Sequence, residues 1–143
     1  MPALRLTFAI LLLSLLALSQ SACSGTRVGV KSAEAYNARP LKVYIPLAVD
    51  DPAAIKAAES GLIGRGWAVI DKSDEHITGK LHQRRFEATV DIKIEDQNLV
   101  IYSDSTYLDP QTNELTPAVP YGWLKNLQQD IQKFVAYENY RNN

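Results

Sequence analysis

Cys23 is the single cysteine of the 143-residue chain, and this limits what thiol chemistry the protein can supply. One thiol forms no internal disulfide, and a cysteine-based zinc site needs several cysteines. The position of Cys23 is informative, because an apolar run has just ended there and a polar segment begins.

The segment before Cys23 has the organisation of a secretory signal peptide. Arg5 precedes residues 6–18, which read LTFAILLLSLLAL and carry no charge. A helix of that length spans about 20 Å, less than the ~30 Å hydrocarbon core of a bilayer. We therefore expect residues 1–22 to be a signal peptide. A permanent membrane helix is the alternative.

Ser21-Ala22-Cys23 resembles the lipobox of bacterial lipoproteins, although Gln20 stands where an aliphatic residue is usual. The resemblance implies that Cys23 becomes the first residue of the mature chain. It also implies a diacylglycerol thioether and an amide-linked acyl chain there, so that membrane lipid is a partner. Ser24, rather than Asp, implies sorting to the outer membrane, facing the periplasm. Ordinary cleavage after Ser21 or Ala22, which leaves a free thiol, is the competing interpretation.

Other residue types that could perform chemistry do not form a recognisable catalytic or metal-binding pattern. His76 and His82 are about 20 Å apart if they lie on one strand, too far to share a metal, and we interpret both as solvated. No G-x-S-x-G sequence occurs, so Ser103 and Ser105 are expected to be buried hydroxyls bonded to the last helix or the loop before it. The sequence predicts no catalytic residue, metal or cofactor.

Charged and aromatic clusters each have a functional and a structural interpretation. Without the spacing of a calcium loop, the acidic residues are interpreted as a solvated face: Asp91, Glu95, Asp96, Asp104 and Asp109. A basic cluster could meet an anionic partner such as lipid A phosphate or another protein: Lys80, His82, Arg84 and Arg85. Aromatic residues could line a ligand groove or form core and rim: Trp67, Tyr102, Tyr107, Tyr121 and Trp123. A formal charge of −1 gives no bulk attraction to nucleic acid.

Apolar periodicity predicts the elements that position these residues. Alternating residues predict strands at 41–47, 67–71, 77–81, 86–95 and 99–106, with a turn at 96–98 joining the last two in a hairpin. Asp50 and Pro52 predict the start of a helix that ends near Arg65. Pro120 opens a second helix after a loop at 109–120.

The second helix is expected to bury one apolar stripe and to fray from Tyr137 onward. The stripe consists of Trp123, Leu127, Ile131 and Phe134, flanked by Leu124 and Val135.

The order β-α-β-β-β-β-α predicts an α+β fold. Two helices should pack on one face of a mostly antiparallel sheet of four or five strands, and the other face should be polar. If the first two strands pair in parallel, a right-handed crossover joins them. The expected division is a signal peptide at 1–22, a lipidated amino terminus and flexible tether at 23–40, and the α+β domain at 41–143; Val28 and Val30 could add a short edge strand.

Five short segments resemble a family of small Gram-negative lipoproteins without an established activity: GRGW (64–67), ITGKLHQR, VDIKI, IYSDSTYLD and YGWLKNLQQDI. The matching residues are Tyr102, Asp104, Ser105, Leu108, Tyr121 and Trp123. No catalytic residue is implied by this resemblance. Asp104, Ser105, Tyr121 and Trp123 are interpreted as a binding site or as a structural latch of strand, loop and helix.

These observations lead to one expected function and one alternative. We expect a membrane-anchored, non-enzymatic binding or scaffold module of the Gram-negative cell envelope, with an envelope protein as partner. The alternative is a periplasmic carrier of a small ligand or lipid, using an aromatic groove between helices and sheet.

Overall fold

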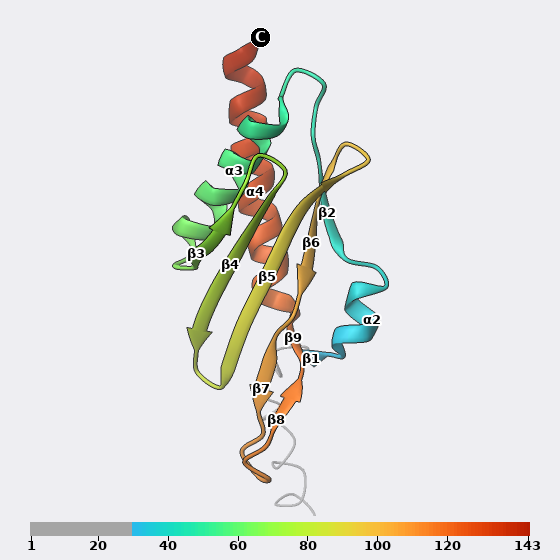
Figure 1. Ribbon diagram of the computed structural model, residues 1–143, viewed down its shortest axis with the longest axis vertical. Coiled ribbons are helices and arrows are strands. Elements are labelled where there is room, and N and C mark those ends of the chain that lie inside the picture. The colour runs from blue at the N-terminus through green and yellow to red at the C-terminus, as the bar shows by residue number, and fades with distance from the viewer. Residues whose placement is uncertain (1–29) are drawn as a thin grey trace, which may run out of the picture.

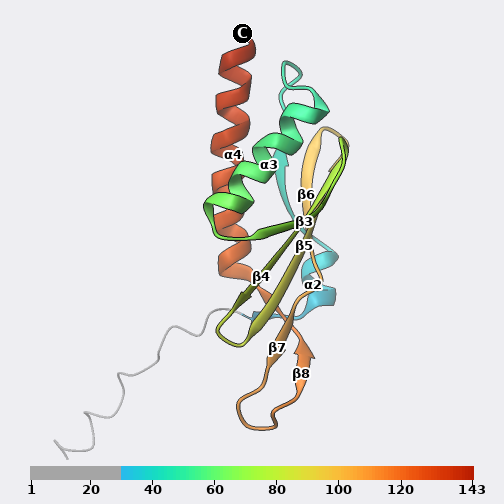
Figure 2. The same cartoon turned by 60° about the vertical axis from the view of Figure 1, so that its left-hand side comes forward.

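The computed structural model describes residues 30–143, in which a twisted sheet lies against two long helices (Figures 1 and 2). In chain order the elements are β1 (Val30–Lys31), α2 (Ala33–Asn37), β2 (Leu41–Tyr44), α3 (Asp51–Gly64), β3 (Ala68–Lys72), β4 (His76–Gln83), β5 (Phe86–Glu95), β6 (Asn98–Ser103), β7 (Thr106–Leu108), β8 (Leu115–Pro117), β9 (Val119–Pro120) and α4 (Tyr121–Asn142). The predicted signal peptide and Cys23 lie outside the described residues.

The main sheet has the strand order β2-β6-β5-β4-β3, and all its pairings are antiparallel. This confirms the predicted α+β fold with a mostly antiparallel sheet. β2 and β3 are at opposite edges, so they do not pair, and α3 carries the chain across the face of the sheet between them (Figure 2).

β5 shows how the sequence separates the two faces of the sheet. Alternate side chains are buried in the core: Phe86, Ala88, Val90 and Ile92. On the opposite face, Lys93 Nζ lies 2.8 Å from Asp91 Oδ2. Tyr102 of β6 donates its hydroxyl to Glu95 on the same face, at 3.1 Å. The face away from the helices is therefore polar, as its alternation predicts.

α3 begins where its capping signal predicts, because the Asp50 carboxylate accepts a hydrogen bond from Ala53 N at 3.0 Å. Its contacts on both sides depend on glycine. A Cβ on Gly61 would lie 2.7 Å from Ile131 Cγ1 of α4, and a Cβ on Gly79 of β4 would lie 2.6 Å from Leu62 Cδ2. The two glycines therefore let α3 approach both α4 and the sheet closely.

α4 buries a stripe that differs from the predicted one at Phe134. The buried residues are Leu124, Leu127, Ile131, Val135 and Glu138. Phe134 is 38% exposed, because it lies about 100° around the helix from Val135, which faces the core. The predicted fraying is also wrong: the helix continues to Asn142, and the nearly buried Glu138 pairs with Arg141 at 2.7 Å and with Lys56 at 3.9 Å.

The predicted flexible tether is wrong for residues 32–40, because they contain α2, which Tyr36 and Asn37 hold against β6. Ser32 caps α2, and Tyr36 is buried with 2% exposure. The Asn37 amide bonds both backbone groups of Ser103: Nδ2 donates to the carbonyl at 2.9 Å, and Oδ1 accepts from the amide at 3.1 Å. The domain therefore begins earlier than predicted, at β1, which pairs with β9.

The segment expected to continue the fifth strand and then form a loop contains a break and a second hairpin. β6 ends at Ser103, and after Asp104 and Ser105 the chain enters β7, which pairs with β5 and β8. Asp109 closes the β7–β8 turn. Its pKa is lowered because the backbone amides of Gln111 and Thr112 donate to its carboxylate.

Tyr36 makes stability depend on pH in the alkaline range. Its hydroxyl donates to the Ile101 carbonyl at 2.6 Å, and burial raises its pKa to about 12. An unfolded tyrosine ionises near pH 10, so the unfolded chain binds fewer protons between pH 10 and 12, and stability falls as pH rises. We expect this residue to account for a loss of about 2 kcal/mol across that window.

Tyr36→Phe should remove this alkaline contribution and cost about 1–2 kcal/mol at pH 7, through the lost hydrogen bond. Urea unfolding at a series of pH values measures both effects. Tyr44→Phe, at an exposed tyrosine of β2, is the matched control. If the free energy of unfolding fell equally steeply with pH above pH 10 in the wild-type chain and in Tyr36→Phe, Tyr36 would not be the cause of the loss.

Candidate functional site

Ser105 is buried where the main sheet breaks between β6 and β7. Its hydroxyl accepts from Thr89 N at 3.1 Å, donates to the Thr89 carbonyl at 3.2 Å and lies 2.7 Å from Ser103 Oγ. Both serines are buried as predicted, with 2% or less exposure. The backbone partners of the Ser105 hydroxyl differ from the expected last helix or loop, because they lie on strand β5. Asp104 is exposed beside it, and its backbone amide donates to the Thr89 carbonyl at 3.0 Å.

Tyr121 and Trp123 lie at the amino-terminal end of α4 and pack against aromatic rings from other elements. Tyr121 meets Tyr36 of α2 edge to face, with ring centroids 6.3 Å apart. Trp123 meets Phe86 of β5 in the same way at 5.3 Å. The four residues interpreted above as a binding site or latch therefore do not form one cluster. Asp104 and Ser105 contact β5, Tyr121 contacts α2, and Trp123 contacts β5 at a different place.

The aromatic residues considered for a ligand groove are divided between the two faces of the sheet. Trp67 is 4% exposed in the core, whereas Tyr102 is bonded to Glu95 on the polar face. Trp67 and Trp123 share a hollow of about 150 Å³, which is small beside the 300–1,000 Å³ of typical ligand pockets. The five aromatic residues considered from the sequence thus do not line one common groove.

Three hydrogen-bonded side chains, a serine, a histidine and an aspartate, lie at the β3–β4 turn. The sequence analysis did not predict this arrangement. Ser73 Oγ lies 2.6 Å from His76 Nδ1, and His76 Nε2 lies 2.8 Å from Asp71 Oδ2. The hydrogen bond from His76 is the main cause that lowers the pKa of Asp71. The Asp-x-Ser-x-x-His spacing across a turn was the available signal.

The hydrogen bonds of these three side chains stabilise the β3–β4 turn rather than activate a nucleophile. The Ser73 hydroxyl already accepts from the backbone amides of Glu75, at 3.3 Å, and His76, at 3.2 Å. The imidazole is also reversed relative to a serine hydrolase, where Nε2 faces the nucleophile. His82 is exposed further along β4, the strand that His76 begins, and the described residues contain no group of three metal-ligating side chains.

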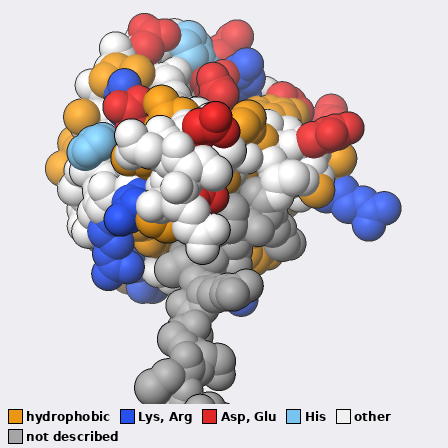
Figure 3. Space-filling model, turned by 90° about the horizontal axis from the view of Figure 1, so that it is seen from below, with side chains coloured by type: hydrophobic (Ala, Val, Ile, Leu, Met, Phe, Trp, Pro, Cys, Tyr) orange, Lys and Arg blue, Asp and Glu red, His pale blue; other side chains and the backbone are white. Residues whose placement is uncertain are grey.

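The basic cluster lies at the β4–β5 turn, at the lower end of the molecule in Figure 1. Lys80, Arg84 and Arg85 are all exposed, and Arg84 has φ of 57° in the turn. Seen from below, the largest group of Lys and Arg side chains lies at the lower left of the view, and others are scattered elsewhere (Figure 3). The Arg85 carbonyl accepts from Leu108 N at 2.8 Å, which fixes the turn beside β7.

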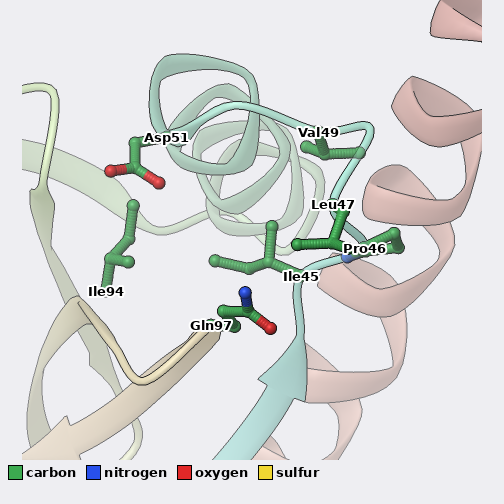
Figure 4. Close-up of a pocket in the computed structure, with 7 residues that line it drawn as sticks. All are labelled: Ile45, Pro46, Leu47, Val49, Asp51, Ile94 and Gln97. Atoms are coloured by element: carbon green, nitrogen blue, oxygen red, sulfur yellow. The ribbon is translucent and has the colours of Figure 1, made fainter.

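A second hollow, here called the end pocket, lies at the opposite end of the molecule, near the β5–β6 turn (Figures 1 and 4). It has a volume of about 340 Å³ and is lined by Ile45, Pro46, Leu47, Val49, Asp51, Ile94 and Gln97. Two parts of the chain form it: the segment between β2 and α3 with the first residue of α3, and the end of β5 with the β5–β6 turn. Ile45 N donates to the Gln97 carbonyl at 2.8 Å and ties the two parts together.

The end pocket combines an apolar floor with polar groups at its rim. Ile45 and Val49 are about 95% buried beneath it, with 4% and 5% exposure, whereas Leu47 is 85% exposed. Asp51 supplies a carboxylate and Gln97 an amide (Figure 4). Sequence reasoning missed this site because its residues come from two parts of the chain that only the β2–β6 pairing brings together. The floor of such a pocket can bind an apolar group, and the rim can bind a cation or a hydrogen-bond donor next to that group.

Comparison of the chain with protein-family models, with curated proteins and with solved structures returned no match. Among residues 30–143, no helix is both long and apolar enough to cross a bilayer.

Proposed function

We propose that the protein is a non-enzymatic binding module of the Gram-negative cell envelope, anchored in the outer membrane by acyl chains on Cys23 and facing the periplasm. The observation that carries the proposal is the position of Cys23, which directly follows a signal-type sequence and stands seven positions (30 − 23) before Val30, where β1 begins. Because β1 pairs with β9, the chain enters the domain at a fixed point.

The short interval between Cys23 and Val30 sets how far the domain reaches from the membrane. Seven residues span at most about 25 Å when fully extended. β1 lies in the lower half of the molecule and the end pocket at its upper end (Figure 1). An anchor at Cys23 would therefore leave the end pocket accessible from the periplasm.

The end pocket is the site at which we propose that an envelope protein binds. Its buried floor of Ile45 and Val49 favours an apolar side chain, and Asp51 favours a cationic neighbour on the partner. The carrier alternative has weaker support, because the aromatic side chains do not converge on one groove.

Site-specific photocrosslinking in cells tests this role. A photoreactive amino acid in place of Leu47 should capture a distinct envelope protein. The same substitution at Leu115, an exposed leucine of β8, is the matched control. Asp51→Lys should reduce the Leu47 product by about tenfold, since it reverses the charge at the rim. Recovery of no protein above background at Leu47, or equal products at both positions, would contradict the proposal.

A further inference from the structure

A second surface, independent of the anchor and of the end pocket, lies between α3 and α4 on the side away from the sheet. Figure 2 shows the two helices side by side on one face. Their outer groove has a volume of about 710 Å³. We propose that this groove binds an acidic amphipathic helix of a partner protein.

The floor of the groove is aromatic. Phe134 and Tyr137 of α4 are 38% and 60% exposed, although neither belongs to the buried stripe of that helix. They are three residues apart and so lie on one side of α4. On the α3 side, the small residues Ser60 and Gly64 line the groove.

The rim of the groove carries an excess of positive charge. Asp130 is held by Arg65 and Lys133, and Glu138 is held by Lys56 and Arg141. Three basic side chains that line the groove, Lys56, Lys133 and Arg141, therefore accompany two carboxylates, an excess of +1 in a chain whose formal charge is −1. An acidic partner complements this rim, whereas a second copy of the chain would bring one positive rim against another.

The shape of the groove favours a helix over a small molecule. A pocket for a small ligand encloses most of the ligand surface, but this groove is open to solvent above both helices. From Asp130 to Arg141 it follows α4 for about 16 Å, or about three helical turns. That length fits apolar anchors spaced i, i+4 and i+7 on a docked helix.

The test measures binding of a labelled model helix to the full chain by fluorescence anisotropy, in a nonionic detergent with detergent alone as the blank. The probe has about 18 residues, with leucine on one face and glutamate on the flanks. A matched peptide carries lysine in place of every glutamate. We expect the acidic peptide to bind and the basic peptide to bind at least about tenfold more weakly.

Variants locate the binding site. Phe134→Ser combined with Tyr137→Ser should weaken binding of the acidic peptide by about tenfold or more, because it removes both aromatic contacts. Lys133→Glu should also weaken it, and Asp130 keeps Arg65 as a partner in this variant. Leu115→Ser, at the other end of the molecule, should leave binding unchanged. Thermal unfolding of each variant verifies that the domain is folded.

Three results would overturn the proposal: no binding of the acidic peptide, equal binding of both peptides, or undiminished binding by the folded Phe134/Tyr137 variant. None of these depends on acylation of Cys23 or on the end pocket. A negative result here is therefore distinguishable from failure of the proposed function.

Discussion

Gly61→Val is expected to lower the free energy of unfolding by about 3 kcal/mol, one of the largest effects of any single substitution in the domain. A Cβ at this position would lie 2.7 Å from Ile131 Cγ1 and 3.5 Å from Ile131 Cα. Relief requires α4 to move away from α3, which would loosen the buried stripe against the sheet. The favourable helix propensity gained on replacing glycine is about 1 kcal/mol or less, so the steric cost exceeds it.

Gly64→Val is the matched control for this prediction. Gly64 is on the same helix, but no atom lies within 4 Å of a Cβ placed there. We expect its unfolding free energy to stay within about 0.5 kcal/mol of the wild-type value. Ile131→Ala should partly rescue Gly61→Val, because it removes the colliding atom, and urea unfolding of the double-mutant cycle measures the coupling. Equal costs for the two glycine substitutions would contradict the close-approach argument.

Cys23→Ser is expected to transfer nearly all of the protein from the membrane pellet to the soluble fraction after a carbonate wash. Serine cannot form the thioether, and anchoring by two or more acyl chains is stable where one chain is marginal. Ser24→Ala, which leaves the cysteine in place, should remain in the pellet. Quantitative immunoblotting of the two fractions measures the change.

Mass spectrometry of the mature amino terminus separates the remaining interpretations. An acylated Cys23 at the first position is the expected result for the wild-type chain. A free thiol would indicate ordinary signal cleavage. Retention of Cys23→Ser in the washed pellet, with an intact amino terminus, would instead support the alternative of a permanent membrane helix at residues 6–18.

The parts of the fold that are encoded locally could be predicted from the sequence. The fourth predicted strand and β5 share the same bounds, Phe86–Glu95, because ten residues alternate strictly between apolar and polar. The start of α3 follows from Asp50 and Pro52, whose cap and fixed φ act within one turn. These signals need no knowledge of distant residues.

The parts that depend on distant partners could not be predicted in this way. α2 is five residues long, and its Tyr36 and Asn37 bond to residues 65 and 66 positions away. Phe134 and Val135 are neighbours and both apolar, and only the packing of α4 against the rest of the domain decides which of them is buried. The end pocket likewise exists only once β2 pairs with β6.

Both edge strands of the main sheet, β2 and β3, have features that oppose pairing with a strand from another copy of the chain. At the β2 edge, Gln128 Nε2 of α4 donates to the Lys42 carbonyl at 2.7 Å and so occupies an acceptor. At the β3 edge, the register shifts between Val69 and Asp71, and charged side chains follow. An incoming strand would meet a filled acceptor on one side and a bulge on the other, both of which oppose edge-to-edge pairing. The fold thereby resists sheet-mediated aggregation when many copies are crowded together.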